Sequence, residues 1–343
     1  RAAGGWVRDK LLGRTSDDVD ISVDNMSGVE FGECIKAYME QKDGTEVKMG
    51  VIQANPDQSK HLETATMRLG EHEIDIVNLR TESYSEGSRI PTIAIGTPTE
   101  DAERRDFCMN ALFYNVNTGA VEDWTGRGLD DLLTNRLVRT PLPPSVTFLD
   151  DPLRLLRAVR FAVRFNFAID DAVVAAALEP AVSSALATKI SRERVGKEFE
   201  GMLSGSCADA PKALGYFRVM NLLDIIFGTV GAVEPFVPTE EAWLDALEAA
   251  RWAQLRLNGS STNSVEHGRL VLLGCTVLPF ANVIVMAGKK KKPTAAVSLV
   301  LGESIKFKNK DASNVTLIAD LTNDMVQAAA DVAAADTGAA DAE

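Results

Sequence analysis

Carboxylates are crowded into the stretch GGWVRDKLLGRTSDDVDIS, which opens with a glycine pair. Side chains alternate between the two faces of a β-strand, so Asp18 and Asp20 share one face, while Asp17 falls on the other face or in the preceding turn. Two neighbouring ionised carboxylates repel each other unless a cation binds beside them. Mg²⁺ prefers oxygen ligands and is often held by one or two carboxylates together with substrate phosphates. The pattern therefore predicts a magnesium site at Asp18 and Asp20.

The glycine pair adds a second chemical feature, because Gly4 and Gly5 precede a predicted helix, VRDKLLG. Glycines let backbone N–H groups approach an anion closely, and a helix N-terminus favours negative charge. The stretch thus combines a phosphate-binding turn with a metal-binding pair, a combination that suits a nucleoside triphosphate with Mg²⁺. The alternative is an acidic turn beside a glycine turn that binds nothing.

A third carboxylate would complete a two-metal site of the kind that serves in-line displacement at phosphorus. The segment HEIDIVNLR places Glu73 and Asp75 on one face of a predicted strand. Asp75 lies between two isoleucines, which indicates the interior of the strand, whereas Glu73 lies nearer its end. We therefore favour Asp75, and the alternative is an unrelated exposed acid.

The segment DDPLRLLRAVRFAVRF predicts an amphipathic helix with an apolar back and an arginine front. Pro152 suits the first turn, and Asp150 or Asp151 can cap the helix. At about 100° per residue, one arc of roughly 120° holds the four arginines Arg154, Arg157, Arg160 and Arg164. Like charges at this spacing destabilise a helix unless an anion binds, and arginine suits planar contact with bases and phosphates. The alternative is a solvated charged face.

The elements that must position these residues change character along the chain. Alternating segments such as DVDIS, EIDIVNL and ALFYNV predict strands, and SGVEFGECIKAYMEQ predicts a helix between them. Residues 140–148 are proline-rich and suggest a hinge, and helical periodicity dominates beyond them. We expect an α+β domain at the start of the chain, a domain boundary near residue 148 and mainly helical structure beyond it.

Composition sets limits on function. The net charge of −13 argues against nucleic acid as a partner, but a local basic patch can still bind phosphate. No apolar run reaches the ~20 residues of a membrane span, and the four cysteines show no CxxC spacing. The basic run Lys289–Lys292 could contact phosphate or be a solvated loop. The segment Thr81–Arg104, rich in Gly, Pro, Ser and Thr, predicts a long loop that could act as a lid.

The order of motifs resembles that of the class II tRNA nucleotidyltransferases, the CCA-adding enzymes, in their eukaryotic, plant- and fungus-like form. The resemblance rests on the stretches quoted above and on RRDFCMNALFYN, VEDWTGRGLDDL, RTPLPP and SRERVGKEFEGML, and it is strongest from residue 4 to about residue 200. It implies an α+β fold: a polymerase-beta-like nucleotidyltransferase head with a mixed sheet at 1–147, a helical neck at 148–205, and a helical, tRNA-binding body and tail at 206–343. The chain begins without Met and lacks the family's N-terminal lead-in, so we expect a fragment.

The resemblance assigns roles residue by residue. Asp18 and Asp20 match the metal-binding acids, and Asp75 falls where a third catalytic acid is expected. The resemblance implies three nucleotide-binding groups: the triphosphate motif Gly4, Gly5, Arg8 and Asp9; the ribose-reading motif Arg104, Arg105 and Asp106, with Asn110 in the same stretch; and the template helix Asp151, Arg154, Arg157 and Arg160. Asp151 and Arg154 together could match the Watson–Crick edge of C or A and reject G and U.

The implied activity is addition of CCA to the 3′ end of tRNA, using CTP and ATP with two Mg²⁺ ions. The alternatives are a CC-adding enzyme or poly(A) polymerase of the same fold, or an inactive RNA-binding relative. We expect no membrane association and no obligate protein partner. We also expect an intracellular location, for which cytoplasm, nucleus, mitochondrion and plastid all stay open.

Overall fold

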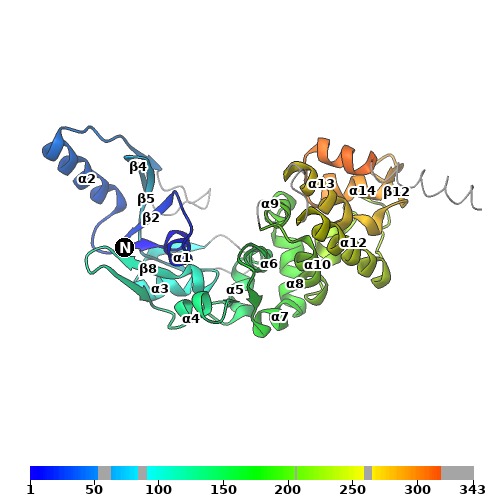
Figure 1. The fold of residues 1–343 in the computed structure, drawn as a ribbon, viewed down its shortest axis with the longest axis horizontal. Helices are drawn as coiled ribbons and strands as arrows, with labels where there is room; N and C mark the ends of the chain where they lie inside the picture. Colours follow the sequence, from blue (N-terminus) through cyan, green and yellow to red (C-terminus); the bar gives the residue numbers. More distant parts are fainter. Residues whose placement is uncertain (53–62, 84–90, 205–206, 259–264, 318–343) are drawn as a thin grey trace, which may run out of the picture. The chain divides into compact units, whose positions relative to one another are not determined.

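The computed structural model describes residues 1–52, 63–83, 91–204, 207–258 and 265–317 (Figure 1). They form two compact units. The first comprises Arg1–Arg154 with Phe167–Val182, and the second comprises Leu155–Asn166 with the residues from Ser183 onward. In these ranges no single helix is long and apolar enough to cross a membrane, although the bent pair α7 (Asp171–Ala177) and α8 (Pro180–Lys189) passes by length and composition. The division into head, neck and body stays a prediction.

A seven-stranded mixed sheet, in the order β3-β4-β5-β2-β1-β8-β9, forms the centre of the first unit. Its strands are β1 (Ala2–Ala3), β2 (Asp18–Val23), β3 (Met49–Ile52), β4 (Thr64–Leu69), β5 (His72–Asn78), β8 (Leu112–Asn115) and β9 (Ala120–Asp123). Strands β2 and β5 are parallel to each other, and every other pair of neighbouring strands in this sheet is antiparallel. The α+β fold class with a mixed sheet is therefore confirmed.

Helix α2 (Gly28–Asp43) covers the sheet and confirms the helix expected in this segment. A capping box defines its start: the Ser27 side chain accepts from the Glu30 N–H, and the Glu30 carboxylate accepts from the Ser27 N–H. The helix lies very close to the strands, since a Cβ added to Gly28 would lie 2.4 Å from the carbonyl oxygen of Ile76. Glycine at this position lets α2 settle against β5, beside which the acids of β2 lie.

The segment Thr81–Arg104, expected as one long loop, contains regular structure. Strands β6 (Arg80–Ser83) and β7 (Thr92–Ile95) form an antiparallel hairpin, and α3 (Pro98–Glu103) follows. Residues 84–90, at the centre of the predicted lid, lie outside the described residues. The loop prediction was wrong for the rest because the β-branched residues of β7 pair with β6, and because Thr97 and Glu100 cap α3 reciprocally.

Shorter elements complete the first unit. They are α1 (Gly5–Leu11), the 3₁₀ turn η2 (Cys108–Asn110), α4 (Gly128–Leu133), α5 (Pro144–Asp150), α7 (Asp171–Ala177) and the parallel pair β10 (Leu137–Val138) and β11 (Ala168–Ile169). The expected hinge at 140–148 ends in helix, because Pro144 occupies the first turn of α5, where its missing N–H costs nothing. Asp151 then separates α5 from α6 (Leu153–Phe165) and accepts a hydrogen bond from the Leu153 N–H at 3.2 Å.

The second unit is helical apart from one hairpin. Its elements include α8 (Pro180–Lys189), which begins in the first unit, α9 (Arg192–Leu203), α10 (Ala210–Val219), α11 (Leu223–Phe227), α12 (Glu240–Asn258), α13 (Val265–Thr276), η3 (Leu278–Phe280), α14 (Ala296–Leu299) and η4 (Val300–Ser304). Aromatic residues fill its core, where the Phe199 ring lies edge-on to Phe227 at 5.2 Å. The hairpin joins β12 (Ile284–Ala287) to β13 (Lys292–Ala295), so the run Lys289–Lys292 forms its turn and the start of β13.

Candidate active site

The predicted metal-binding acids lie on two adjacent parallel strands. Asp20 on β2 is directly opposite Asp75 on β5, and Asp18 is opposite Glu73. Asp18 is exposed, whereas Asp20 and Asp75 are half-buried. Thr66 on the neighbouring strand β4 donates its hydroxyl proton to Asp75 Oδ1 at 2.6 Å. The structure thus brings the three predicted acids to one part of the sheet and adds a threonine that holds the third.

The electrostatics of these acids favour a cation. Burial, and then the charge of Asp18, raises the pKa of Asp20; Asp75 adds to this, while Arg105 and Arg80 oppose it. A raised carboxyl pKa means that the ionised form is disfavoured where it stands. Burial and the carboxylates of Asp18 and Asp75 therefore disfavour the ionised form of Asp20 more than Arg105 and Arg80 favour it, and a bound cation would offset this.

The donor set suits an ion that keeps part of its water shell. Within the described ranges, no three His, Cys, Asp or Glu side chains are gathered closely enough to hold a metal by themselves. Mg²⁺ does not require such a cage, since it commonly uses one or two carboxylates plus waters and substrate phosphates. Asp18 and Asp20 on one strand face, with excess negative charge around Asp20, fit Mg²⁺ on this chemistry.

The residues of the triphosphate motif form a buried polar chain. Arg8, in α1, donates to Asp9 Oδ1 at 2.8 Å and to Asn110 Oδ1 at 2.5 Å. Asn110 in turn donates to Asp106 Oδ1 at 2.9 Å. Arg8 and Asp9 are each 5% exposed, so both side chains are engaged inside the protein. The structure therefore joins two motifs that lie about one hundred residues apart.

Gly4 makes room for this arrangement. Its φ of +66° is in the left-handed region, which favours glycine, and α1 starts directly after it at Gly5. A Cβ at Gly4 would lie 2.5 Å from Nη1 of Arg105. The glycine pair thus admits an arginine side chain close to the backbone at the start of α1.

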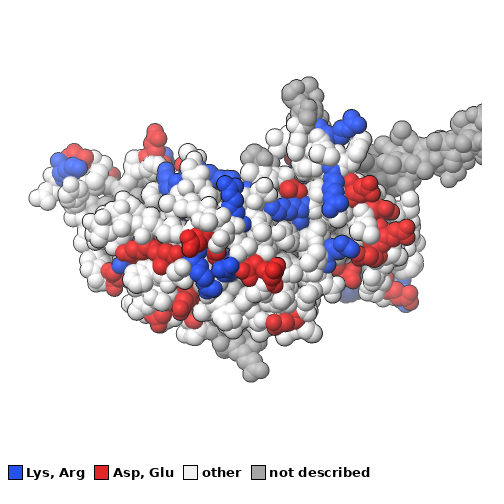
Figure 2. Space-filling model, turned by 60° about the horizontal axis from the view of Figure 1, so that its bottom comes forward, with Lys and Arg blue, Asp and Glu red and all other residues white. Residues whose placement is uncertain are grey.

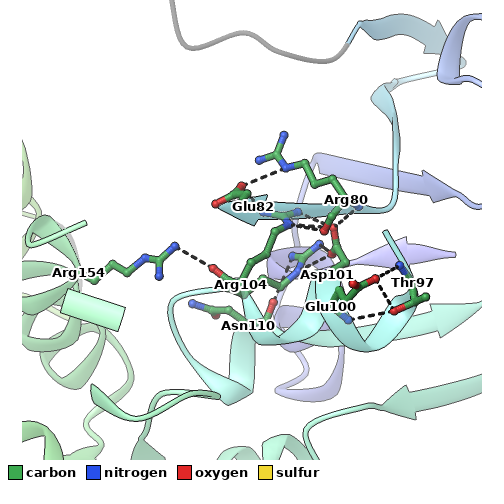
Figure 3. Close-up of polar contacts among 9 residues, drawn as sticks. Arg80, Glu82, Thr97, Glu100, Asp101, Arg104, Asn110 and Arg154 are labelled. Atoms are coloured by element: carbon green, nitrogen blue, oxygen red, sulfur yellow. Dashed lines mark hydrogen bonds and ion pairs between the residues drawn. The ribbon is translucent and has the colours of Figure 1, made fainter. Parts of the chain in front are cut away.

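The two arginines of the ribose-reading motif converge on one acid that the sequence reasoning missed. Asp101, in α3, contacts Arg104 Nη2 at 2.6 Å and Arg105 Nη2 at 2.9 Å (Figure 3). Glu82 on β6 pairs with Arg104 at 3.1 Å and with Arg80 at 3.2 Å. A signal for Asp101 was present in the sequence, because acids three and four residues before arginines face them on a helix.

The template arginine reaches the same region of the first unit. Arg154 Nη2 donates to the carbonyl oxygen of Arg104 at 2.8 Å, and Nη1 donates to that of Thr147 at 3.5 Å. Asp151, three residues before Arg154, caps the first turn of α6. The Arg154 guanidinium therefore lies beside the backbone of Arg104, a residue of the predicted ribose-reading motif.

The remaining template arginines, Arg157 and Arg160, belong to the second unit. Arg160 Nε pairs with Glu198 Oε2 of α9 at 2.6 Å, and Arg157 Nη1 lies 3.7 Å from Glu198 Oε1. Both guanidinium groups also lie over the ring of Phe161, at 5.3 and 4.5 Å from its centre. The expectation of uncompensated charge on this helix face was wrong for these two residues, because the acid comes from a different helix.

The surface does not carry its net charge evenly. On the face in Figure 2, basic side chains gather in groups between acidic ones. The net charge of −13 therefore leaves room for locally basic surface.

Comparisons with known proteins match part of this chain. Residues 1–139 match the family model described as the poly A polymerase head domain. The chain is 48% identical over 241 residues to tRNA nucleotidyltransferase cca2 of Schizosaccharomyces pombe, covering 69% of this chain and 49% of that protein. It is 54% identical over 209 residues to the mitochondrial CCA tRNA nucleotidyltransferase of Saccharomyces cerevisiae, covering 60% and 38%. The chain thus spans half or less of the length of these two relatives.

Two solved structures are similar to this chain in fold. The chain superposes with a TM-score of 0.56 and 26% identity on a tRNA nucleotidyltransferase complexed with a primer tRNA and an incoming ATP analogue, covering 80% of this chain and 71% of that one. A CCA-adding enzyme in an apo form shares the fold, with a TM-score of 0.64 and 20% identity over 95% of this chain and 68% of that one.

Proposed function

We propose that this chain belongs to the nucleotidyltransferase family whose head-domain model residues 1–139 match, and that it adds CCA to the 3′ end of tRNA from CTP and ATP. One observation carries the proposal: Asp20 lies opposite Asp75 on adjacent parallel strands, two residues from Asp18. Arg80 and Arg105 are close enough to affect the pKa of Asp20, so cationic side chains that could bind a nucleotide lie near these acids. The names of the relatives supply the substrates. Since one relative is named mitochondrial, mitochondrial tRNA is among the substrates to test.

In the proposed reaction, the tRNA 3′-hydroxyl attacks the α-phosphorus of CTP or ATP, and pyrophosphate leaves. Asp18 and Asp20 would hold Mg²⁺, and Asp75 would be the third catalytic acid, oriented by Thr66. When bound, two Mg²⁺ ions would make the 3′-hydroxyl more acidic and neutralise the leaving phosphates. The glycine turn at Gly4 and Gly5 lies beside the triphosphate.

Recognition of the nucleotide falls to the polar groups of the first unit. Arg104, Arg105 and Asp106 contact the ribose, with Arg8, Asp9 and Asn110 supporting them through the buried chain described above. Asp151 and Arg154 select the base, because one offers an acceptor and the other several donors, and a wrong base would leave them unpaired. Arg157 and Arg160 pair with Glu198 within the second unit, and a contact between them and the nucleotide stays a prediction.

One experiment separates this activity from its alternatives. The full-length protein is incubated with Mg²⁺ and a tRNA that lacks CCA, with each nucleoside triphosphate alone and in pairs. We expect C addition with CTP alone and complete CCA only with CTP and ATP together, and an Asp18→Ala variant should be inactive. A CC-adding enzyme would stop after two C residues, a poly(A) polymerase would extend with ATP alone, and an inactive relative would add nothing.

A further inference from the structure

Asp101 is nearly sealed from solvent, with 1% of its surface exposed, yet it lies at the end of a short helix beside two arginines. Its two carboxylate oxygens divide their contacts. Oδ1 accepts from Nε and Nη2 of Arg104, at 3.0 and 2.6 Å, and from the backbone N–H of Arg80 at 3.1 Å. Oδ2 accepts from Nε and Nη2 of Arg105, at 3.0 and 2.9 Å.

This arrangement fixes the direction of both guanidinium groups. Each one presents its Nε–Nη2 edge to a single oxygen, so the plane of each fork is set by Asp101. An arginine side chain has considerable rotamer freedom, and a guanidinium that is already held in place loses less of it when it binds a ligand. Asp101 therefore preorganises two cations at once.

Further contacts complete the orientation of each arginine. Arg104 Nη1 pairs with Glu82 Oε1 at 3.1 Å, while Arg105 Nη1 donates to the carbonyl oxygen of Asn110 at 3.3 Å. The Arg105 guanidinium also lies 5.1 Å from the centre of the Phe113 ring. Both arginine side chains keep some exposure, 15% and 16%. Part of each arginine side chain thus stays exposed to solvent.

The pKa of Asp101 is consistent with stable ion pairs to Arg104 and Arg105. Although burial alone would raise it, the guanidinium groups of Arg105 and Arg104 hold the pKa of Asp101 below its ordinary value. Asp101 is therefore ionised at neutral pH. The cluster of Arg80, Arg104 and Arg105 with Glu82 and Asp101 keeps one net positive charge, which suits an anionic ligand.

The cluster also touches the base-selecting residue. The backbone carbonyl that accepts from Arg154 is that of Arg104, whose side chain Asp101 holds. Figure 3 shows this sequence of contacts, from Arg154 to Arg104 and on to Asp101. One buried acid is thus connected to the ribose-reading arginines directly and to Arg154 through Arg104.

We propose that Asp101 is a positioning residue of the nucleotide site: its buried carboxylate orients Arg104 and Arg105 for contact with the incoming nucleotide, and Glu82 assists at Arg104. The inference rests on the proposed function, since it assumes that these arginines bind CTP and ATP. Asp101 contacts no substrate in this scheme and acts through the two arginines.

The test compares Asp101→Asn with Glu100→Gln in the full-length protein. Glu100 precedes Asp101 in the same helix and loses the same charge, but its carboxylate caps the helix at Thr97, a contact that glutamine can keep (Figure 3). Initial rates with CTP, 2′-deoxy-CTP and tRNA are measured for both variants, together with the thermal midpoint of unfolding.

We expect Asp101→Asn to raise the KM for CTP by about tenfold or more, because charge-assisted hydrogen bonds of ~1.5–3 kcal/mol are lost from the arginine forks. Discrimination against 2′-deoxy-CTP should fall, while the KM for tRNA should stay within about twofold of the unaltered protein. In an Arg105→Ala background, the same substitution should have a smaller further effect, because the two residues act as a unit.

The outcomes are separable. If the unaltered protein adds no nucleotide, the proposed function fails. If it is active and Asp101→Asn matches Glu100→Gln in KM and in ribose discrimination, the positioning role is overturned, even if the midpoint of unfolding falls. Should Asp101→Asn not fold, Glu82→Gln tests the same cluster at Arg104, where a smaller rise in KM supports the role and an unchanged KM overturns it.

Discussion

Asp20 and Asp101 are two carboxylates of the same unit with opposite electrostatic surroundings. Burial, and then the charge of Asp18, raises the pKa of Asp20. Asp101 is the more deeply buried of the two, yet its pKa is lowered, since Arg105 and Arg104 outweigh the effect of burial. Burial alone would move both in the same direction. The difference lies in the balance of neighbours: Asp18 and Asp75 act against Arg105 and Arg80 at Asp20, whereas Arg105 and Arg104 form direct ion pairs with Asp101.

This difference separates two uses of a carboxylate. At β2 and β5, acids face one another and leave negative charge that a bound cation would neutralise. At α3, an acid is already paired and serves to hold cations in a fixed direction. The charges around a carboxylate thus distinguish two kinds of site in this unit. Neighbouring acids indicate a site that could bind a cation, and paired arginines indicate a carboxylate that orients other side chains.

The largest expected effect comes from removing charge at the acids of β2. Asp20→Asn should lower kcat/KM for C addition by about 1,000-fold, because several kcal/mol of charge stabilisation at the reacting phosphate are lost. Initial rates of addition to a tRNA without CCA measure it. Asp17→Asn is the matched control, an exposed acid in the same segment that should stay within about twofold. Equal losses in both variants would contradict the assignment of Asp20.

Stability should distinguish Asp101 from Asp20 next. Asp101→Asn removes the partner of two arginines and should destabilise the protein by roughly 3 kcal/mol at pH 7. Because the folded-state pKa of Asp101 is lowered, its contribution is present above the unfolded value of about 3.9 and is lost as the pH falls through the folded value.

Urea unfolding of the unaltered protein and of Asp101→Asn at several pH values measures the contribution of Asp101 to the free energy of unfolding. The difference between unaltered protein and Asp101→Asn should be equal at pH 7 and pH 5 and should narrow only below about pH 4. Narrowing between pH 7 and pH 5 would show that the carboxylate is not held ionised by its arginines.

Asp20→Asn should have the opposite effect on stability. Without divalent cations, it should raise the thermal midpoint by about 2–4 °C at neutral pH, since it relieves repulsion among acids that are forced together. Adding Mg²⁺ should raise the midpoint of the unaltered protein more than that of the variant, because the ion binds the folded state through this charge. Scanning calorimetry with and without Mg²⁺ measures these midpoints. An equal rise in the midpoint of the unaltered protein and of Asp20→Asn on adding Mg²⁺ would count against a metal at Asp20.

The sequence predicted those features that depend on local spacing. Strand alternation placed Asp18 and Asp20 on one face, and the segment containing Ser27 and Glu30 formed its helix as expected. The pairing of Asp20 with Asp75 could not be derived by spacing, because which strands become neighbours depends on the whole sheet. The sequence identified Asp20 and Asp75 as separate candidates, and the parallel register of β2 and β5 places them opposite each other.

Partners from distant segments account for most of what the sequence did not show. Glu198 is 38 residues from Arg160, so no local pattern links them. Arg8 meets Asn110 across 102 residues for the same reason. Asp101 is different, since its spacing to Arg104 and Arg105 was visible, but the surrounding segment resembled a loop and hid the helix.

The smallest expected effect concerns Thr66, which supports the acid opposite Asp20. Thr66→Val keeps the shape of the side chain but removes the hydroxyl that donates to Asp75 Oδ1 at 2.6 Å. We expect a loss of about 1 kcal/mol in the binding or chemistry that depends on Asp75, or about fivefold in kcat/KM at limiting Mg²⁺. Thr64→Val, two residues earlier on the same face of β4, is the control and should leave the rate within about twofold. If Thr66→Val were as active as Thr64→Val at every Mg²⁺ concentration, Asp75 would not need its hydrogen bond. The acid edge would then depend on charge alone, in contrast to Asp101, whose role depends on geometry.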